Sequence, residues 1–174
     1  MDKLRRRIRN VPDFPKPGIQ FKDITTLLKD GKSFAEVIDK FDEKYRSRHV
    51  DIIVGIESRG FIFGGALAYK LGVGFVPIRK PGKLPADAIS EEYELEYGTD
   101  TMEIHSDAIM PGQNILIIDD LIATGGTMEA ATRLIERLGG VIVGIAYLID
   151  LTFLKGSEKV NRYDRYCLIE YDGD

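Results

Sequence analysis

The chain has 174 residues, 44% of them hydrophobic, which is enough for one core of ordinary size, so we expect a single domain over residues 1–174. The net charge of −4 gives no overall case for nucleic acid, and no apolar run approaches the roughly 20 residues that cross a bilayer, so we expect neither partner. One cysteine, Cys167, excludes an intrachain disulfide and, with only two histidines, offers no zinc-binding spacing, which suits a cytoplasmic protein.

The first ten residues carry five basic side chains, a composition also found in transit peptides and nucleic-acid-binding arms. Asp2 interrupts this run, serine is absent, and Leu4 and Ile8 are four residues apart, as on one face of a helix. We therefore predict a short helix that docks one apolar edge on the core.

Three prolines follow within six residues, at positions 12, 15 and 17, and they argue against both a helix and a free edge strand. We predict an extended, ordered loop. Its apolar side chains would be wasted on a flexible linker, so we expect them to pack as a cover over another part of the molecule: Phe14, Ile19, Phe21 and Ile24.

Ser33 and Glu36 match a capping box, which predicts the start of a helix. Its apolar side is formed by residues at helical spacing, from Phe34 to Tyr45. We interpret this helix as scaffold.

Residues 51–56 form an apolar run typical of a buried strand, and a helix is expected from about 61 to 71. The turn between them contains Ser58 and Arg59, a hydroxyl and a guanidinium beside the free N–H groups of a helix N-terminus, which favours an anion site. A serine nucleophile is a second interpretation, but that motif requires glycine two residues earlier, where the chain has Ile56.

A third short strand is predicted over residues 72–78, followed by a charged stretch that extends to about residue 104. Glutamates alternate with apolar residues from 92 to 97, and a turn at 98–100 precedes a second run, which predicts a two-stranded ribbon. A long excursion from a sheet strand is typical of a lid over an active site.

The most informative stretch is residues 115–127. Four large apolar residues at 115–118 predict a strand buried on both faces, the central strand of a parallel sheet. Asp119 and Asp120 follow, and as buried carboxylates they require polar partners such as ribose hydroxyls or hydrated Mg²⁺. A small-residue turn then leads into a helix with apolar residues up to Leu138, and its N–H groups and threonine hydroxyls can hold a phosphate.

Two further strands are predicted over residues 141–148 and 165–170. Parallel strands end at one edge of a sheet, so the turns at 58–60 and 123–127 should face a single crevice. The sequence therefore predicts an α/β fold with two anion sites facing one ligand.

Residues 115–127 resemble the phosphoribosyltransferase motif, which is a hydrophobic run, two acidic residues, a short turn and Thr-Gly-Gly-Thr. Three other segments are similar to adenine-specific members of that family: residues 18–24, Gly-Ile-Glu-Ser-Arg-Gly-Phe at 55–61, and Leu-Glu-Tyr-Gly at 95–98. The resemblance covers essentially the whole chain. It implies the type I phosphoribosyltransferase fold, a mostly parallel five-stranded sheet flanked by helices, with an N-terminal hood over about residues 1–28 and a flexible lid over about 80–104.

The resemblance also implies the reaction, which is transfer of the 5-phosphoribosyl group from its 1-diphosphate to N9 of adenine in purine salvage, giving AMP and diphosphate. It assigns the ribose 5-phosphate to Asp119 and Asp120 and to the turn Ala123, Thr124, Gly125, Gly126 and Thr127. It assigns the diphosphate to Ser58, Arg59, Arg79 and Lys83, with Arg59 also counted as catalytic.

In the same family the hood binds the base, which implies adenine contacts at Gln20, Phe21, Lys22 and Leu151. Glu96 would accept the N9 proton, and Tyr97 belongs to the lid. The resemblance further implies Mg²⁺ held mainly through the substrate, with water linking it to Asp119 or Asp120, and a homodimer in which one basic residue reaches the partner's site.

Several alternatives remain open at this point. Phe21 could be a core aromatic, and Glu96 one of several solvated carboxylates. Gln20 occupies a position where a small apolar residue is common, and Pro81 interrupts the basic start of the lid. The chain could act on another purine base, or be a non-catalytic sensor of phosphoribosyl pyrophosphate, although a regulator would need a DNA-binding domain for which we see no room.

Overall fold

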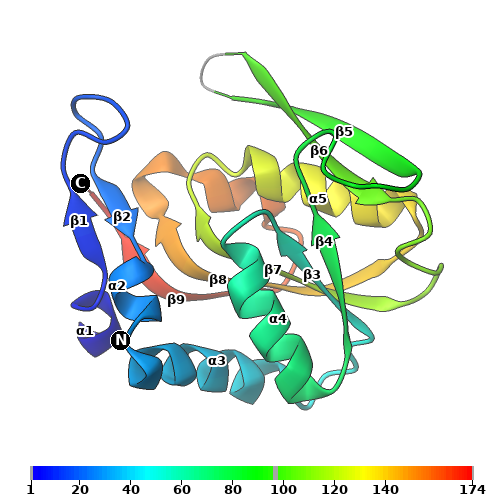
Figure 1. Cartoon of the computed structure of the whole chain (residues 1–174), viewed down its shortest axis with the longest axis horizontal. Helices are drawn as coiled ribbons and strands as arrows, with labels where there is room; N and C mark the ends of the chain where they lie inside the picture. The colour runs from blue at the N-terminus through cyan, green and yellow to red at the C-terminus, as the bar shows by residue number, and fades with distance from the viewer. Residues whose placement is uncertain (1, 96–97, 174) are drawn as a thin grey trace.

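The computed structural model describes residues 2–95 and 98–173, and a five-stranded sheet lies at its centre (Figure 1). The spatial order is β4-β3-β7-β8-β9, and every neighbouring pair is parallel. The prediction of a mostly parallel five-stranded sheet is confirmed. The strands are β3 (Ile52–Ile56), β4 (Gly74–Ile78), β7 (Asn114–Ile122), β8 (Val141–Leu151) and β9 (Arg165–Tyr171).

Strand β7 is the middle strand, as predicted from its apolar run. Residues 115–118 are all fully buried. Their side chains alternate, so that Leu116 and Ile118 join one hydrophobic cluster and Ile115 and Ile117 join the other. A strand covered on both faces needs apolar residues at consecutive positions, which explains the absence of polar alternation.

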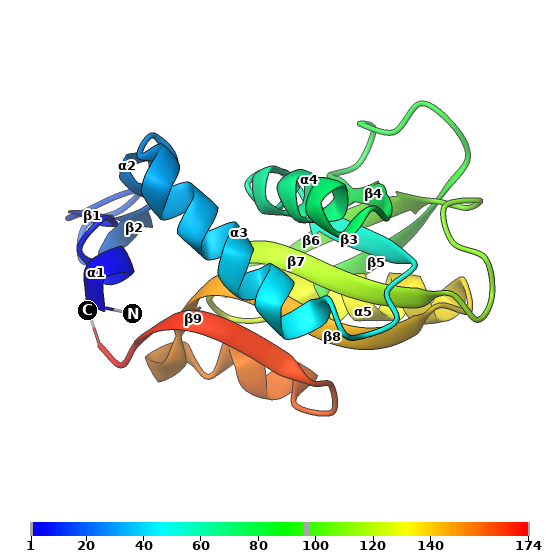
Figure 2. The same cartoon turned by 90° about the horizontal axis from the view of Figure 1, so that it is seen from below.

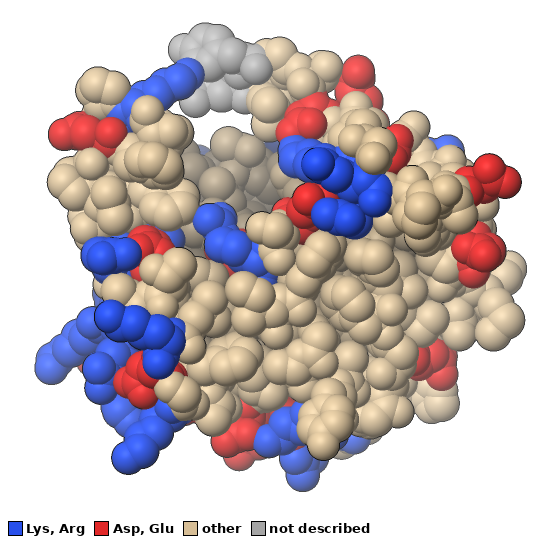
Figure 3. All heavy atoms as spheres, in the orientation of Figure 1, with Lys and Arg blue, Asp and Glu red and all other residues tan. Residues whose placement is uncertain are grey.

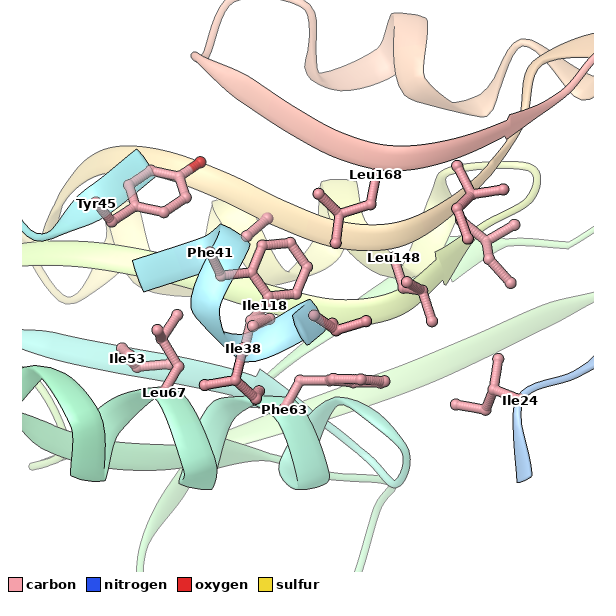
Figure 4. Packing of buried hydrophobic residues seen from close by; sticks show 14 of the residues in the cluster. Ile24, Ile38, Phe41, Tyr45, Ile53, Phe63, Leu67, Ile118, Leu148 and Leu168 are labelled. Atoms are coloured by element: carbon pink, nitrogen blue, oxygen red, sulfur yellow. The ribbon is translucent and has the colours of Figure 1, made fainter. Parts of the chain in front are cut away.

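Helices cover the two faces of the sheet (Figure 2). One cluster packs α3 (Gly31–Tyr45) and α4 (Gly60–Leu71) on one face, through residues such as Phe41 and Phe63 (Figure 4). The other cluster packs α5 (Gly126–Arg137) on the opposite face. Within the described ranges, none of these helices combines the length and apolar character needed to cross a membrane.

Helix α3 begins three residues earlier than the capping-box prediction. Asp30 is the N-cap, and its carboxylate accepts a hydrogen bond from the Lys32 N–H at 3.2 Å. The Ser33 hydroxyl donates to the same carboxylate at 3.1 Å, so Ser33 lies inside the first turn. The prediction that Ser33 caps the helix was wrong because an aspartate one turn upstream can also cap it.

The N-terminal segment contains two short helices, α1 (Asp2–Arg5) and α2 (Thr25–Leu28), and α1 buries Leu4 as predicted. Between them, β1 (Arg9–Val11) and β2 (Phe21–Asp23) form an antiparallel ribbon, where we had predicted only a loop. The three prolines lie in the connection between the two strands, where no ladder hydrogen bond is needed.

The apolar side chains of this segment only partly form the expected cover. Ile24 is buried, but Phe14 and Ile19 are 51% and 44% exposed. Phe14 instead packs edge-on against Phe21, with ring centroids 5.2 Å apart.

The predicted ribbon is confirmed as β5 (Ala88–Glu94) paired antiparallel with β6 (Thr99–His105), although β6 begins within the turn that was predicted at 98–100. It packs on α5, where Glu91 accepts hydrogen bonds from Arg133 and Arg137 at 3.3 and 3.0 Å. The ribbon is therefore supported by a helix rather than isolated.

Two short 3-10 helices, Thr152–Leu154 and Gly156–Val160, connect β8 to β9.

The cluster between α3, α4 and the sheet predicts a large stability effect at Leu148, which is fully buried on β8 (Figure 4). Leu148→Ala should lower the free energy of unfolding by about 2–5 kcal/mol, because the cavity adds to the lost burial. Urea titration measures this. Val141→Ala, at the 49% exposed start of the same strand, should change it by less than about 1 kcal/mol. Equal losses in the two variants would contradict this description of the core.

Candidate active site

A cleft of about 420 Å³ opens at the carboxyl ends of β3 and β7. On the surface, the molecule is hollowed between the N-terminal ribbon and the β5–β6 ribbon (Figure 3). The cleft is lined by Glu57, Ser58, Arg59, Lys80, Tyr93, Met102, Asp119, Asp120, Leu121, Ile122, Ala123, Thr124, Gly125, Thr127 and Met128. The two predicted anion turns thus face the same space.

The turn after β3 lies very close to the end of β7, and Gly60 makes this possible. A Cβ atom at Gly60 would lie 2.8 Å from the Ile118 carbonyl oxygen and 3.0 Å from Asp119 Oδ1. Any side chain there would push the start of α4 away from the acidic pair. The Glu57–Ser58 peptide bond in this turn is cis.

The turn after β7 is equally compact. Gly125 has φ +77°, a left-handed conformation that favours glycine, and a Cβ there would collide with the carbonyl oxygen of Gly156. A Cβ at Gly156 would in turn collide with the Ala123 carbonyl oxygen. The turn leads into α5, whose first N–H groups have no intrahelical partner and can bind an anion.

The acidic pair is buried between these turns, with Asp119 9% and Asp120 4% exposed. Asp119 Oδ1 accepts a hydrogen bond from the Asp120 N–H at 2.8 Å. Arg59 Nε lies 2.6 Å from Asp120 Oδ2, but the contact lacks hydrogen-bond alignment, since that oxygen has no hydrogen-bond partner among the described residues. Burial, and secondly the charge of Asp120, raises the pKa of Asp119 well above its usual value.

Arg79 and Lys83, predicted to bind the diphosphate, do not line the cleft of this chain. Arg79 instead pairs with Glu57: its Nε donates to Glu57 Oε2 at 3.3 Å and its Nη2 donates to Glu57 Oε1 at 3.2 Å. Lys83 is exposed. Burial alone would raise the pKa of Glu57, but the Lys80 N–H hydrogen bond and the Arg79 charge outweigh it and lower that pKa.

Lys80 lines the cleft although sequence reasoning did not select it. Its ammonium pairs with Asp100 and donates to the Tyr93 hydroxyl at 3.2 Å. Tyr93 lies directly opposite Asp100 in the ribbon and donates to the same carboxylate at 3.1 Å. The basic run at 79–83 was a visible signal, but the sequence did not specify which of its cations faces the cleft.

The residues predicted to contact a base lie outside the lining of this cleft. Phe21 does contact a residue that lines the cleft, because the Arg59 guanidinium lies 5.5 Å from the centre of the Phe21 ring. The side chains of Gln20 and Lys22 contact Asn10, and Leu151 is the last residue of β8. Glu96 and Tyr97 fall outside the described residues.

This geometry suits a ligand that carries anionic groups at two ends and hydroxyl groups between them. The helix N-terminus and turn at 123–127 can hold one anion, and Ser58, Arg59 and Lys80 can hold another. The buried carboxylate oxygen of Asp120 lies between them and can accept a hydroxyl or a hydrated cation.

Comparison with known proteins gives consistent similarities. A family model described as "Phosphoribosyl transferase domain" matches residues 23–170. A relative from Chloroflexus aurantiacus, an adenine phosphoribosyltransferase, is 58% identical over 168 residues, which are 97% of each chain. The crystal structure of an adenine phosphoribosyltransferase from Thermoanaerobacter pseudethanolicus superposes with a TM-score of 0.95 at 54% identity, covering 98% of this chain and 99% of that one.

A third similar structure was solved with ligands. It is adenine phosphoribosyltransferase from Saccharomyces cerevisiae, complexed with adenine and an imino-altritol 1,6-bisphosphate. It superposes with a TM-score of 0.90 at 42% identity and covers 96% of this chain and 97% of that one. The likeness therefore spans both ribbons as well as the sheet.

The raised pKa of Asp119 predicts a pH-dependent stability change. A carboxyl whose folded pKa exceeds its unfolded pKa ionises more readily in the unfolded chain, so its cost to folding is absent in acid and grows as the pH rises from the unfolded pKa toward the folded pKa. Asp119→Asn should therefore raise the free energy of unfolding at pH 7, by about 1.4 kcal/mol per unit of upward shift, and the gain should vanish toward pH 4.

Urea titrations from pH 4 to 8 test this, with Asp107→Asn as an exposed control that should change little at any pH. A destabilised Asp119→Asn protein at pH 7 would contradict the assignment of Asp119 as a buried acid with a raised pKa.

Proposed function

The chain belongs to the phosphoribosyltransferase family, and we propose that its cleft transfers a 5-phosphoribosyl group to adenine. The donor is 5-phospho-α-D-ribose 1-diphosphate, and the products are AMP and diphosphate. The observation that carries this proposal is the pair of anion-binding turns, Ser58–Arg59 and Ala123–Thr127, on neighbouring strands of one cleft. Their separation by the acidic pair matches a sugar that has phosphates at its 5- and 1-positions.

The 5′-phosphate would lie at the start of α5. The turn at 123–127 leads into α5, and its last N–H groups lie at the helix N-terminus, where the helix dipole favours negative charge. The hydroxyls of Thr124 and Thr127, both in the cleft lining, add further donors. Fixing this end of the donor places its anomeric carbon toward the other turn, which reduces the entropy cost of reaction.

The leaving diphosphate would lie at the turn after β3. Ser58 supplies a hydroxyl, Arg59 a guanidinium that can contact two oxygens at once, and Lys80 an ammonium. Negative charge accumulates on this group as its bond to the sugar breaks. Cations fixed in advance at that position stabilise the transition state more than the ground state.

Asp119 and Asp120 would hold the ribose hydroxyls. The Asp120 oxygen without a hydrogen-bond partner among the described residues is a suitable acceptor, and it also fits a hydrated Mg²⁺. No group of three or more metal-ligating side chains occurs in the described part of the chain, so we propose that the ion is held mainly by donor oxygens, with water linking it to this pair. When bound, Mg²⁺ would neutralise charge on the diphosphate.

The adenine would enter from the N-terminal ribbon. We propose that Phe21 stacks on the ring, that the backbone of residues 20–22 reads its edge, and that Leu151 closes the other side. The contact between Arg59 and Phe21 supports this, because it brings the aromatic ring next to the diphosphate turn. The hood over about residues 1–28 and the lid over about 80–104 would then enclose both substrates and exclude water from the activated sugar.

We also propose a homodimer. In this chain Lys83 is exposed outside the cleft and Arg79 pairs with Glu57, which supports the idea that one basic residue of the 79–83 run serves the partner's site.

A cytoplasmic location is supported by the single cysteine, which is half-buried and forms no disulfide.

The choice of base tests the proposal directly. The purified protein should release diphosphate from the donor in the presence of Mg²⁺ and adenine, and not with hypoxanthine or guanine. Diphosphate is measured by a coupled phosphatase assay and AMP by chromatography. Activity with hypoxanthine alone would overturn the base assignment, and binding of the donor without turnover on any base would favour a sensor.

Glu96 carries a separate prediction, that it accepts the proton lost from N9 as the new bond forms. Glu96→Gln should lower kcat about 10²–10⁴-fold, since general-base catalysis contributes that much. Glu92→Gln, a change at an exposed carboxylate of β5, should leave kcat within twofold. An unchanged kcat for Glu96→Gln would remove Glu96 from the mechanism.

A further inference from the structure

The side chain of Lys22 is a buried cation, and the proposed function uses only the backbone of this residue. Among residues 2–95 and 98–173 it is the one lysine or arginine that is buried, with 7% of its surface exposed. Burying an ammonium group costs free energy unless its donors are satisfied. Its contacts therefore indicate what holds it in place.

Those contacts join three strands. Lys22 Nζ donates a hydrogen bond to Asn10 Oδ1 at 3.0 Å and lies 4.8 Å from the centre of the Tyr171 ring. Asn10 lies directly opposite Lys22 in the β1–β2 ribbon, and its Nδ2 donates to Gln20 Oε1 at 2.6 Å. One ammonium thus connects β1 and β2 of the hood with β9 of the main sheet.

Tyr171 lies beside the other wall proposed for the base. It is the last residue of β9 and pairs with Leu151 at the end of β8. The Thr152 hydroxyl donates to the Tyr171 carbonyl oxygen at 2.9 Å, which fixes the backbone there. The Arg5 guanidinium also lies 4.7 Å from the centre of the Tyr171 ring, so a second cation holds that ring.

Phe21 is carried by the same strand as Lys22. Side chains alternate along a strand, so Lys22 points to one face of β2 (Phe21–Asp23) and Phe21 points to the other. On that other face, the Arg59 guanidinium lies 5.5 Å from the Phe21 ring centre. Any shift of β2 that follows loss of the Lys22 contacts therefore moves Phe21 relative to Arg59.

We propose that Asn10, Lys22 and Tyr171 form a tether that sets the distance between Phe21 and Leu151, and that Lys22 is a positioning residue for the base. This inference rests on the proposed function, because both walls are assigned there to adenine. The tether lies away from the cleft that is assigned to the donor, so it should affect one substrate and not the other.

The test is a comparison of both Michaelis constants. Lys22→Met keeps the aliphatic stem but removes the charge, and it should raise the KM for adenine about tenfold, equivalent to about 1.4 kcal/mol. The KM for the phosphoribosyl donor and kcat should stay within twofold. Lys22→Arg should restore the KM for adenine, because a guanidinium can donate to Asn10 and stack on Tyr171.

Arg9→Met is the matched control. Arg9 is an exposed cation of the same ribbon and pairs with Asp23, so its loss should leave both Michaelis constants unchanged. Unchanged constants in Lys22→Met, or a parallel rise of both, would overturn the tether. If thermal melting shows that the Lys22→Met protein is not folded, Asn10→Ala takes its place. The same selective rise in the KM for adenine is expected, and an unchanged KM for adenine would overturn the tether.

The wild-type protein is assayed first. AMP formation by the wild type together with an unaffected Lys22→Met protein overturns the tether alone. A wild type that makes no AMP from adenine overturns the proposed function, and the tether with it.

Discussion

The site depends on the close approach of the start of α4 to the end of β7. Gly60 permits this approach, because any larger residue would strike the Ile118 carbonyl oxygen and Asp119. Strands β3 and β7 are parallel neighbours, so each ends at the same edge of the sheet and each is followed by a turn and a helix N-terminus. The two turns that we propose to bind anions therefore meet in one cleft, with the acidic pair between them.

The same approach creates an electrostatic problem that ligand binding would relieve. Asp119 and Asp120 are buried together, and each cation near them is already paired with a carboxylate: Arg59 with Asp120, Arg79 with Glu57 and Lys80 with Asp100. A donor with two phosphate groups would compete for Arg59 and Lys80, while its hydroxyls would replace the lost contacts of Asp120. We therefore expect Arg59 and Lys80 to exchange carboxylate partners for phosphate oxygens when the donor binds.

Most of the sheet and both turns were predictable from the sequence, because a strand buried on both faces and a helix N-terminus leave local patterns. Residues 115–118 and the glycines at 125 and 126 are examples. One error arose where distant contacts decide which side chain faces the cleft. Whether Arg79 or Lys80 faces the cleft depends on Glu57 and Asp100, which lie 22 and 20 residues away from them in the chain. The β1–β2 pairing was missed because the prolines between the strands masked the short runs that pair.

The most direct test of the account is a crystal structure of the protein with 5-phospho-α-D-ribose 1-diphosphate and Mg²⁺. We expect one donor molecule that spans the cleft, with its 5′-phosphate on the N–H groups of residues 123–127 and its diphosphate at Ser58 and Arg59. A donor whose two anionic ends occupy the same turn, or that binds away from the acidic pair, would contradict the claim that the two turns act on a single activated sugar.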